Sequence, residues 1–206
     1  MASTTDLLAA GLTGLGRPAS EALVADLERL AGLVVQWAPS ANLTAHRDPE
    51  AVVRHLILDA LALAQILPHA ASLADLGSGA GFPGFPIALL DRERRVTLVE
   101  SRERPHFFQR AVVRELGLSR VRTLRGRAEA LPAEPHDGVL AQAVGPPRAV
   151  LELMRPWAAP GGWLAIPYSE ELPELDPPDG VAAEDPRRYQ VPLGGPRRSL
   201  WLGRAA

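Results

Sequence analysis

The sequence predicts an α/β fold, in which helices cover both faces of a mostly parallel, seven-stranded sheet and a helical extension precedes that sheet. Three observations lead to this prediction. Short apolar runs alternate with helical patterns from residue 72 onward, two amphipathic patterns come before them, and a glycine-rich turn follows the first run. Strands that alternate with helices are typical of a parallel sheet with crossover helices on its faces.

Two helices are expected ahead of the sheet. Apolar residues recur every three or four positions over Ser20–Trp37, and Ser20 can cap the start of this helix. A turn is expected over Pro39–Arg47. The pair Asp48-Pro49 then sets the start of the second helix, because proline suits the first helical position after a capping residue, and Pro68 marks its end.

The rest of the chain supplies the sheet. Strands are expected at Ser72–Leu76, Arg95–Glu100, Val121–Leu124, Val139–Val144, Trp163–Pro167, Tyr189–Leu193 and Ser199–Gly203. Helices are expected at Pro86–Leu90, Phe107–Leu116 and Ala149–Trp157. A glycine-rich link joins the last two strands and suggests an antiparallel hairpin, whereas the acidic stretch Ser169–Asp185 is expected to be a solvated loop.

Length and composition fit one ordinary domain. With 206 residues, of which 47% are hydrophobic, the chain can bury a sizeable core. We expect a helical extension over residues 1–70 packed on a core of residues 71–206. The absence of cysteine excludes disulfides and thiolate metal sites, and the five histidines have no metal-ligand spacing, so no metal is expected.

Charge and hydropathy point to the cytoplasm. The first twenty residues lack the basic head of a signal peptide, and no apolar run reaches the length of a membrane span. All 22 basic residues are arginines, and eight of them lie between Arg102 and Arg127 beside only two acids. This stretch suits an anionic partner, although its arginines span a helix and a strand and some are expected to be simply solvated.

The glycine-rich turn is the main functional signal. Gly77, Gly79, Gly81 and Gly84 follow a strand and open a helix, which lets the backbone approach a ligand closely. The spacing satisfies both GxGxG and GxGxxG, so it fits S-adenosylmethionine (SAM) and a dinucleotide alike. A turn that only packs strand against helix is the simpler alternative.

Three neighbouring features favour SAM. Asp75 stands where a carboxylate can meet the ammonium group of SAM, whereas it would repel a dinucleotide pyrophosphate. Glu100 ends the next strand and can bind both ribose hydroxyls, although dinucleotide-binding proteins also use an acid there. The final hairpin is common in methyltransferases of this architecture. Asp75 could also be a simple turn cap, and Glu100 an exposed acid at the end of a strand.

At this point the chain resembles the RsmG (GidB) family of bacterial 16S rRNA methyltransferases, over nearly its whole length. The motifs that carry the resemblance are Trp37, Asn42-Leu43-Thr44, Arg54-His55 with Asp59, the loop DLGSGAGFPG at residues 75–84, Glu100-Ser101, Arg127-Ala128-Glu129 and Asp137-Gly138-Val139. The resemblance implies a class I SAM-dependent methyltransferase with a Rossmann-like fold. It also implies methyl transfer from SAM to N7 of one guanine in a decoding-region loop of 16S rRNA, in the small ribosomal subunit.

The expected site follows from the loop and from these motifs. For the cofactor we expect Asp75, Gly77, Gly79, Gly81, Phe82, Glu100, Ser101, Ala128 and Glu129. For RNA we expect Arg54, Arg104, Arg127 and Arg198. The catalytic candidates are Asn42 and His55. No general base is required, because guanine N7 carries a lone pair and no proton, and we expect a monomer.

Three departures from the family pattern concern cations. Arg104-Pro105 stands where the family has Lys-Arg; Gln142 stands in place of an arginine, within Ala141-Gln142-Ala143; and Pro167 stands near the place of a lysine. A changed substrate, or a SAM-binding protein that has lost catalysis, is therefore an alternative function. An oxidoreductase that uses a nicotinamide cofactor is a further one.

Several candidates have simple structural alternatives. His55 could be a packing or solvated residue, and Asn42 could merely close its turn. Phe107 and Phe108 could stack on a base, but burial against the sheet is the expectation for both.

Overall fold

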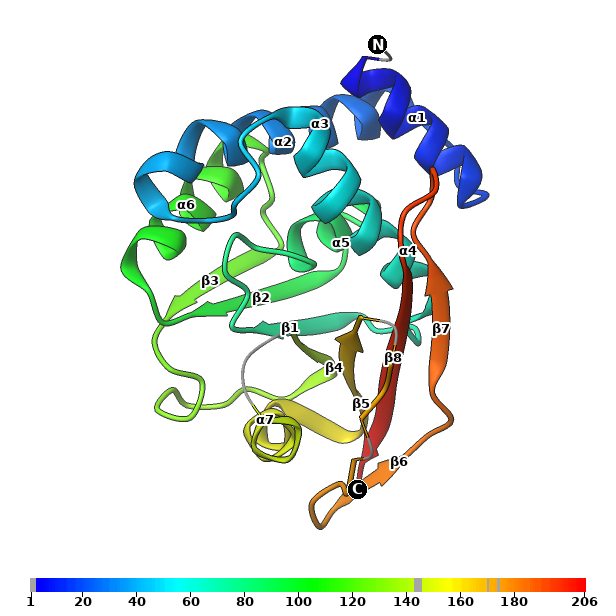
Figure 1. Ribbon diagram of the computed structural model, residues 1–206. Coiled ribbons are helices and arrows are strands. Elements are labelled where there is room, and N and C mark those ends of the chain that lie inside the picture. Colours follow the sequence, from blue (N-terminus) through cyan, green and yellow to red (C-terminus); the bar gives the residue numbers. More distant parts are fainter. Residues whose placement is uncertain (1–2, 143–145, 170, 174) are drawn as a thin grey trace.

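The computed structural model describes residues 3–142, 146–169, 171–173 and 175–206. Its centre is one eight-stranded sheet with the order β3-β2-β1-β4-β5-β8-β6, and β7 also pairs with β8 (Figure 1). The strands are β1 (Ser72–Leu76), β2 (Arg95–Glu100), β3 (Val121–Arg125), β4 (His136–Ala141), β5 (Ala158–Tyr168), β6 (Val181–Ala183), β7 (Arg187–Gln190) and β8 (Arg197–Ala205).

The sheet combines a parallel and an antiparallel part. Strands β1 to β5 are parallel, with β1 between β2 and β4, whereas β8 runs antiparallel to β5. Strands β6 and β7 both pair with β8, also antiparallel. The expected hairpin is confirmed, and each of the seven expected strands has a counterpart.

The number of strands and some strand boundaries differ from expectation; β5, for example, begins at Ala158, five residues before the expected start at Trp163. The eighth strand, β6, lies inside the stretch 169–185 that was expected to be a loop; it forms because its backbone pairs with residues 203–205 of β8. Strand β4 begins at His136, three residues early, and ends at Ala141 among the described residues. The expected strand end at Ala143 and Val144, and Glu170 and Glu174 in the acidic stretch, lie outside the described residues.

The helices form a thick layer on one face of the sheet and a thin one on the other. They are α1 (Thr4–Gly14), α2 (Glu21–Ala41), α3 (Pro49–Val52), the π-helix η1 (Val53–Ile57), α4 (Leu58–Ile66), α5 (Gly84–Leu90), α6 (Glu103–Glu115), α7 (Pro147–Met154) and the 3₁₀-helix η2 (Arg155–Trp157). Helix α7 lies on the opposite face from α1 to α6 (Figure 1).

The first helix, α1, was not expected from the sequence. Ser3 and Asp6 form a reciprocal capping box at its start, and Leu7, Leu8 and Leu12 are buried. Its three buried leucines join the cluster that also contains α2 and α4. Packing against those helices therefore stabilises α1, and its own short apolar pieces gave only a weak periodic signal.

Two proline positions shift helix boundaries. Helix α2 continues past Pro39 to Ala41, where Asn42 adopts φ 48° and donates its N–H to the Ala38 carbonyl. The turn expected from Pro39 onward thus begins three residues later.

Helix α6 starts at Glu103 and not at Phe107, because Pro105 sits in its first turn, where a helical N–H has no partner. The predicted start of a helix at Asp48-Pro49 is confirmed, with Asp48 as its cap.

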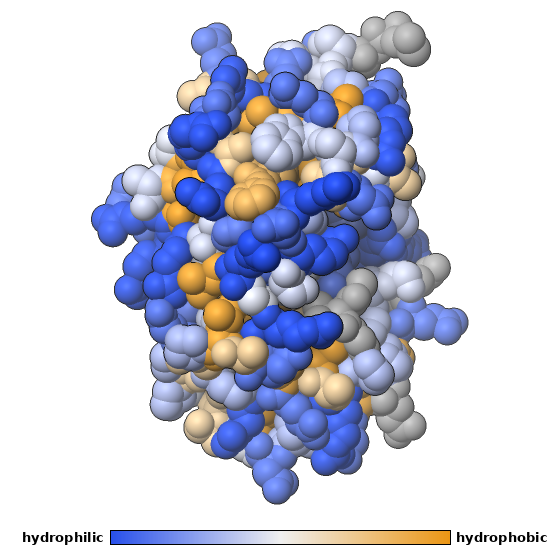
Figure 2. All heavy atoms as spheres, turned by 90° about the vertical axis from the view of Figure 1, so that its left-hand side faces the viewer, coloured by the Kyte–Doolittle hydropathy of each residue, from blue (hydrophilic) through white to orange (hydrophobic). Residues whose placement is uncertain are grey.

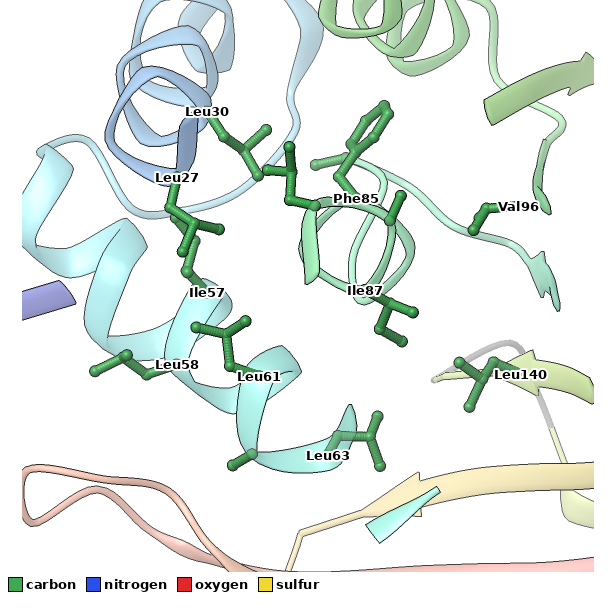
Figure 3. Close-up of a cluster of buried hydrophobic side chains, with 14 of the residues drawn as sticks. Leu27, Leu30, Ile57, Leu58, Leu61, Leu63, Phe85, Ile87, Val96 and Leu140 are labelled. Atoms are coloured by element: carbon green, nitrogen blue, oxygen red, sulfur yellow. The ribbon is translucent and has the colours of Figure 1, made fainter. Parts of the chain in front are cut away.

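Alternating side chains of the strands divide the core into two parts. Leu140, Trp163 and Ala165 face the large cluster under α1 to α6, whereas Val139 and Leu164 face the smaller one under α7. Side chains of α2, α4 and α5 meet in the large cluster, as Figure 3 shows for Leu27, Leu61 and Ile87, among others. The helices before β1 therefore share one hydrophobic core with the sheet.

Within the described parts of the chain, no helix has the length and apolar character needed to span a membrane. Nor do the described histidines and acidic residues gather in groups of three or more that could hold a metal ion.

Candidate active site

The glycine loop lies at the carboxyl end of β1, between that strand and α5. Gly77, Gly79 and Gly81 adopt φ values of 70°, 55° and 78°, which side chains other than glycine rarely adopt. A Cβ on Gly81 would lie 2.2 Å from the Phe85 ring, so packing requires this glycine. A Cβ on Gly79 would meet nothing closer than 3.7 Å. Packing alone thus explains Gly81 but not Gly79.

Hydrogen bonds from two directions hold the loop in place. The N–H groups of Gly77 and Ser78 donate to the Val99 carbonyl of β2, at 2.8 and 3.0 Å. From α6, the amide nitrogen of Gln109 donates to the Gly79 carbonyl at 2.8 Å and to the Ser78 hydroxyl at 2.9 Å. Gln109 is completely buried. Gln109 was not among the expected site residues, because its contact with the loop arises only when α6 packs against it.

Asp75 is buried under the start of α5. One of its carboxylate oxygens accepts the N–H of Gly84 at 3.0 Å, and the residue is only 1% exposed. Burial raises the pKa of the Asp75 carboxyl to about 8; the nearby Glu100 adds to this rise, and the Gly84 N–H opposes it. Asp75 therefore exchanges its proton close to neutral pH, and a cation bound beside it would favour its charged form.

Glu100, at the carboxyl end of β2, faces the same loop. Its carboxylate accepts the backbone N–H of Gly79 at 2.9 Å and that of Arg102 at 2.7 Å. The guanidinium of Arg102 adds two longer contacts, at 3.2 and 3.4 Å. Glu100 is buried, whereas the side chain of Arg102 is 55% exposed, so Arg102 is the partner that can swing away. Arg102 was not among the expected site residues.

The remaining cofactor candidates surround this carboxyl edge of the sheet. Ser101 follows Glu100 directly and is exposed, and Phe82 is half-buried against the large hydrophobic cluster. The Glu100 carbonyl accepts the N–H of Gly126, which brings the segment after β3 beside it. In that segment Ala128 is buried, and Glu129 is exposed.

The four arginine candidates lie on different elements. Arg54 pairs with Glu50 one helical turn away, and Arg104 donates to the Ser40 carbonyl at the end of α2. The side chain of Arg127 is 76% exposed and has only a 3.8 Å contact to Glu129.

Arg198 is tied to the N-terminal helices. Its guanidinium binds one carboxylate oxygen of Asp59 at 3.0 Å, and the Tyr189 hydroxyl donates to the other at 2.9 Å. The same arginine lines a cleft of about 920 Å³ together with Arg188 and Arg197. Arg198 therefore joins β8 to α4, whatever else it contacts.

The two catalytic candidates both lie before the sheet, in the helical extension. Asn42 is exposed and ends α2, which fits a turn-closing role. His55 is exposed on η1 and stacks on His46, with ring centroids 4.7 Å apart. Partial burial and the neighbouring His55 lower the pKa of His46. Among the described residues, no hydrogen bond joins Asn42 or His55 to the glycine loop.

The departures from the family pattern have clear positions. Gln142 directly follows β4 at the carboxyl edge and is exposed. Pro167 is buried in β5 opposite Leu200 of β8. Phe108 is buried as expected, but Phe107 is 45% exposed, so the expectation of burial is wrong for Phe107. It points outward because the buried face of α6 is formed by the residues on either side of it.

Comparisons with known proteins agree on one family. Residues 23–176 match the sequence profile of GidB, described as rRNA small subunit methyltransferase G. The ribosomal RNA small subunit methyltransferase G of Halorhodospira halophila is 41% identical over 187 residues, which cover 87% of this chain and 88% of that protein. Its counterpart in Stenotrophomonas maltophilia is 37% identical over 95% of this chain and 93% of that protein.

A solved structure shows the same fold. The SAM-dependent methyltransferase from Aquifex aeolicus superposes with a TM-score of 0.56 at 18% identity, and the match covers 76% of this chain and 93% of that one.

Proposed function

Because this chain belongs to the GidB family, rRNA small subunit methyltransferase G, we propose that it transfers a methyl group from SAM to N7 of one guanine in a decoding-region loop of 16S rRNA. The observation that carries the proposal is the open side of Gly79, whose N–H is held by the buried carboxylate of Glu100, in a loop whose far end, Gly84, is held by the buried carboxyl of Asp75. In this proposal residues 71–206 are the methyltransferase core, and residues 1–70 are a helical extension that completes the site.

The residues at the carboxyl edge fit SAM. Asp75 would hold the ammonium group and Glu100 the ribose hydroxyls, for which Arg102 gives way; Gly77, Gly79 and Gly81 would let the backbone approach. Phe82, Ser101, Ala128 and Glu129 would complete the pocket, the last two beside the adenine. Bound SAM supplies a methyl group on a sulfonium, which is electrophilic. A pyrophosphate would bring no cation to favour the charged form of Asp75, whereas the ammonium group of SAM does, so the buried carboxyl favours SAM over a dinucleotide.

The protein's task in this reaction is positioning. Guanine N7 is already nucleophilic, so the chain need neither remove a proton nor supply a metal. Its residues must bring N7 in line with the methyl group and exclude water, which is the part of catalysis that orientation provides. We assign Asn42 and His55 to holding the target guanine, because both are exposed polar side chains on the helical extension.

The RNA contacts come from exposed or half-exposed arginines. Arg54, Arg104, Arg127 and Arg198 are the proposed contacts to phosphates, and they compensate for the cations that Gln142 and Pro167 replace. Ribosomal subunits are made and used in the cytoplasm, which is where we place the protein. We propose that it acts as a monomer.

The test is methyl transfer from labelled SAM to small ribosomal subunits isolated from a host that lacks this gene. We expect label in the 16S rRNA, and we expect SAM, but not a nicotinamide cofactor, to raise the melting temperature. If SAM binds but no label is transferred, the protein acts on another substrate or only binds SAM. If a nicotinamide cofactor alone stabilises the protein, the cofactor assignment is wrong.

A further inference from the structure

The outer face of α6 carries an exposed aromatic ring among arginines. Arg104, Phe107, Arg110 and Arg114 are spaced by three, three and four residues, so they share one side of the helix. All four are exposed, whereas their neighbours His106, Phe108, Gln109 and Val112 are buried. We call Phe107, Arg110 and Arg114 the α6 stripe.

Phe107 is an unusual surface residue for this chain. It is 45% exposed, and the described part of the chain has only one other large hydrophobic side chain that is comparably exposed, Leu193 at 42%. Leu193 lies on the turn between β7 and β8, away from the carboxyl edge of β2. The side of the molecule that carries α6 faces the viewer in Figure 2, where hydrophobic side chains stand among hydrophilic ones.

The charged side chains next to Phe107 on α6 are mostly arginines that are not engaged in close ion pairs. Arg110 forms no ion pair with any described residue, and Arg114 reaches Glu115 only at 3.6 Å with a largely exposed side chain. The two acids of α6 are already neutralised from outside the stripe, Glu103 by Arg125 at 2.7 Å and Glu115 by Arg29 at 2.8 Å. The α6 stripe therefore presents an exposed aromatic ring followed along the helix by two exposed arginines, of which Arg110 has no ion-pair partner among the described residues.

This combination suits single-stranded RNA. Aromatic rings stack on bases of any sequence, and arginines beside them neutralise the phosphates. A protein partner would have to place an acidic side chain opposite each arginine. The phosphates of an RNA strand carry a negative charge at every nucleotide and can pair with both arginines. The chemistry of the stripe thus favours RNA over a ribosomal protein.

The α6 stripe lies next to the proposed methyl-transfer site but outside it. Helix α6 starts three residues after Glu100. With about 1.5 Å of rise per residue, Phe107 lies about 6 Å and Arg114 about 17 Å along the helix from its first residue. RNA on the stripe would therefore flank the target guanine and would not reach the cofactor.

We propose that the α6 stripe binds unpaired rRNA next to the target guanine, with a base stacked on Phe107 and phosphates held by Arg110 and Arg114. This inference rests on the proposed rRNA substrate. It adds a surface that the family motifs do not include, because those motifs end at Arg104 and resume at Arg127.

The experiment measures binding to protein-free 16S rRNA, and to small subunits from a host lacking the gene, over a series of salt concentrations. We expect Phe107→Ala to weaken both affinities roughly 5- to 100-fold without changing the salt dependence, and Phe107→Trp to retain them. Arg110→Gln should lower the slope of log affinity against log salt by about 0.7. Leu193→Ala and Arg120→Gln are the matched controls and should bind like the wild type.

Equal binding by wild type, Phe107→Ala and Arg110→Gln would overturn the inference, provided that the wild type methylates the subunits. A loss seen with subunits but not with free rRNA would also overturn it, because the stripe would then contact a ribosomal protein. If the wild type binds SAM but neither binds nor methylates rRNA, the proposed function fails, and the stripe has no such partner. Unchanged melting temperatures of the variants exclude unfolding as the cause of weak binding.

Discussion

The buried amide of Gln109 and the carbonyl of Gly79 are joined by a 2.8 Å hydrogen bond between α6 and the glycine loop. The same amide nitrogen holds the Ser78 hydroxyl, so one side chain fixes two successive loop residues. Residue 79 also donates its N–H to Glu100. The loop conformation on which the proposed cofactor site depends is thus set by α6 as well as by the glycines.

Gln109→Met removes this link while keeping the side-chain volume. The half-buried Gly79 carbonyl and the buried Ser78 hydroxyl lose their donor, which costs about 1–3 kcal/mol, or a drop in melting temperature of roughly 2–10 °C. We also expect weaker SAM binding in titration calorimetry. The control is Gln36→Met, at an exposed glutamine of α2. Unaltered SAM affinity in Gln109→Met would refute the role of this residue in the loop.

Substitutions at Gly79 and Gly81 should distinguish a glycine needed for SAM binding from one needed for packing of the loop. Gly81→Ala forces a Cβ to within 2.2 Å of Phe85 and should lower the melting temperature strongly. Gly79→Ala meets no atom closer than 3.7 Å, so it should cost only about 1–2 kcal/mol for its positive φ. The added methyl group nevertheless stands beside Glu100, and SAM affinity should fall at least tenfold. A Gly79→Ala protein that binds SAM normally would place the cofactor elsewhere.

Asp75 should make the stability of the cofactor-free protein depend on pH. Its pKa rises from an ordinary value of 3.8 to about 8 on folding, because the carboxyl is buried. Between about pH 4 and pH 8 the folded protein therefore binds more protons than the unfolded chain, and the contribution of Asp75 to stability is lost as pH rises through this window. An asparagine side chain at this position would not titrate, so Asp75→Asn should remove this dependence.

Urea unfolding of the wild type and Asp75→Asn at several pH values checks this prediction. We expect the variant to gain stability relative to the wild type as pH rises from 4 to 8, and to bind SAM more weakly because the carboxylate is gone. A stability difference that stays constant over the window is incompatible with a buried carboxyl that titrates near pH 8.

The contact between Arg198 and Asp59 predicts a structural role for this arginine besides any RNA contact. Arg198→Met and Asp59→Asn should each lower the free energy of unfolding by about 1–3 kcal/mol, since each removes a partly buried charge-assisted contact and Arg198→Met leaves Asp59 with only its Tyr189 hydrogen bond. The double variant should lose less than the sum of the two. Arg188→Met, at an exposed neighbour in the same cleft, is the control. Additive losses would mean that the two side chains do not interact.

Gln142→Arg should restore a cation at the carboxyl edge. Residue 142 is exposed directly after β4, so an arginine there can reach bound RNA without repacking the core. We expect tighter rRNA binding with a salt dependence about 0.7 units steeper. Ser119→Arg adds the same charge in the turn before β3 and should have no effect. The lost cation is unimportant if transfer rate and rRNA affinity of Gln142→Arg equal those of the wild type.

Local patterns predicted most of the fold. Apolar alternation located the parallel strands, and Asp48-Pro49 located a helix start, because both depend on neighbouring residues. Helix α1 could have been found from Ser3 and Asp6, whose spacing is that of a capping box. Strand β6 could not, because its three residues are extended only through pairing with β8, about twenty positions further on.

The part of the candidate site that lies at the ends of two consecutive strands could be predicted from the sequence. The glycines and the two acids lie on consecutive strand ends, and parallel strands bring these ends to one edge. Gln109 and Asp59 act across 30 and 139 residues of sequence, on the loop and on Arg198, so no local spacing reveals them. Phe107 was expected to be buried but is exposed. Which face of α6 is exposed depends on how the helix packs against the sheet, and the spacing of Phe107 and Phe108 alone does not show this.

Mapping the methylated position tests the central claim most directly. Small subunits from a host lacking the gene are treated with the protein and SAM, and the 16S rRNA is then cleaved chemically at N7-methylguanine. We predict one new cleavage, at a guanine in the decoding-region loop, and none without SAM. Label at another base or atom, or no cleavage although SAM binds, would contradict the assignment of this chain as a 16S rRNA (guanine-N7) methyltransferase.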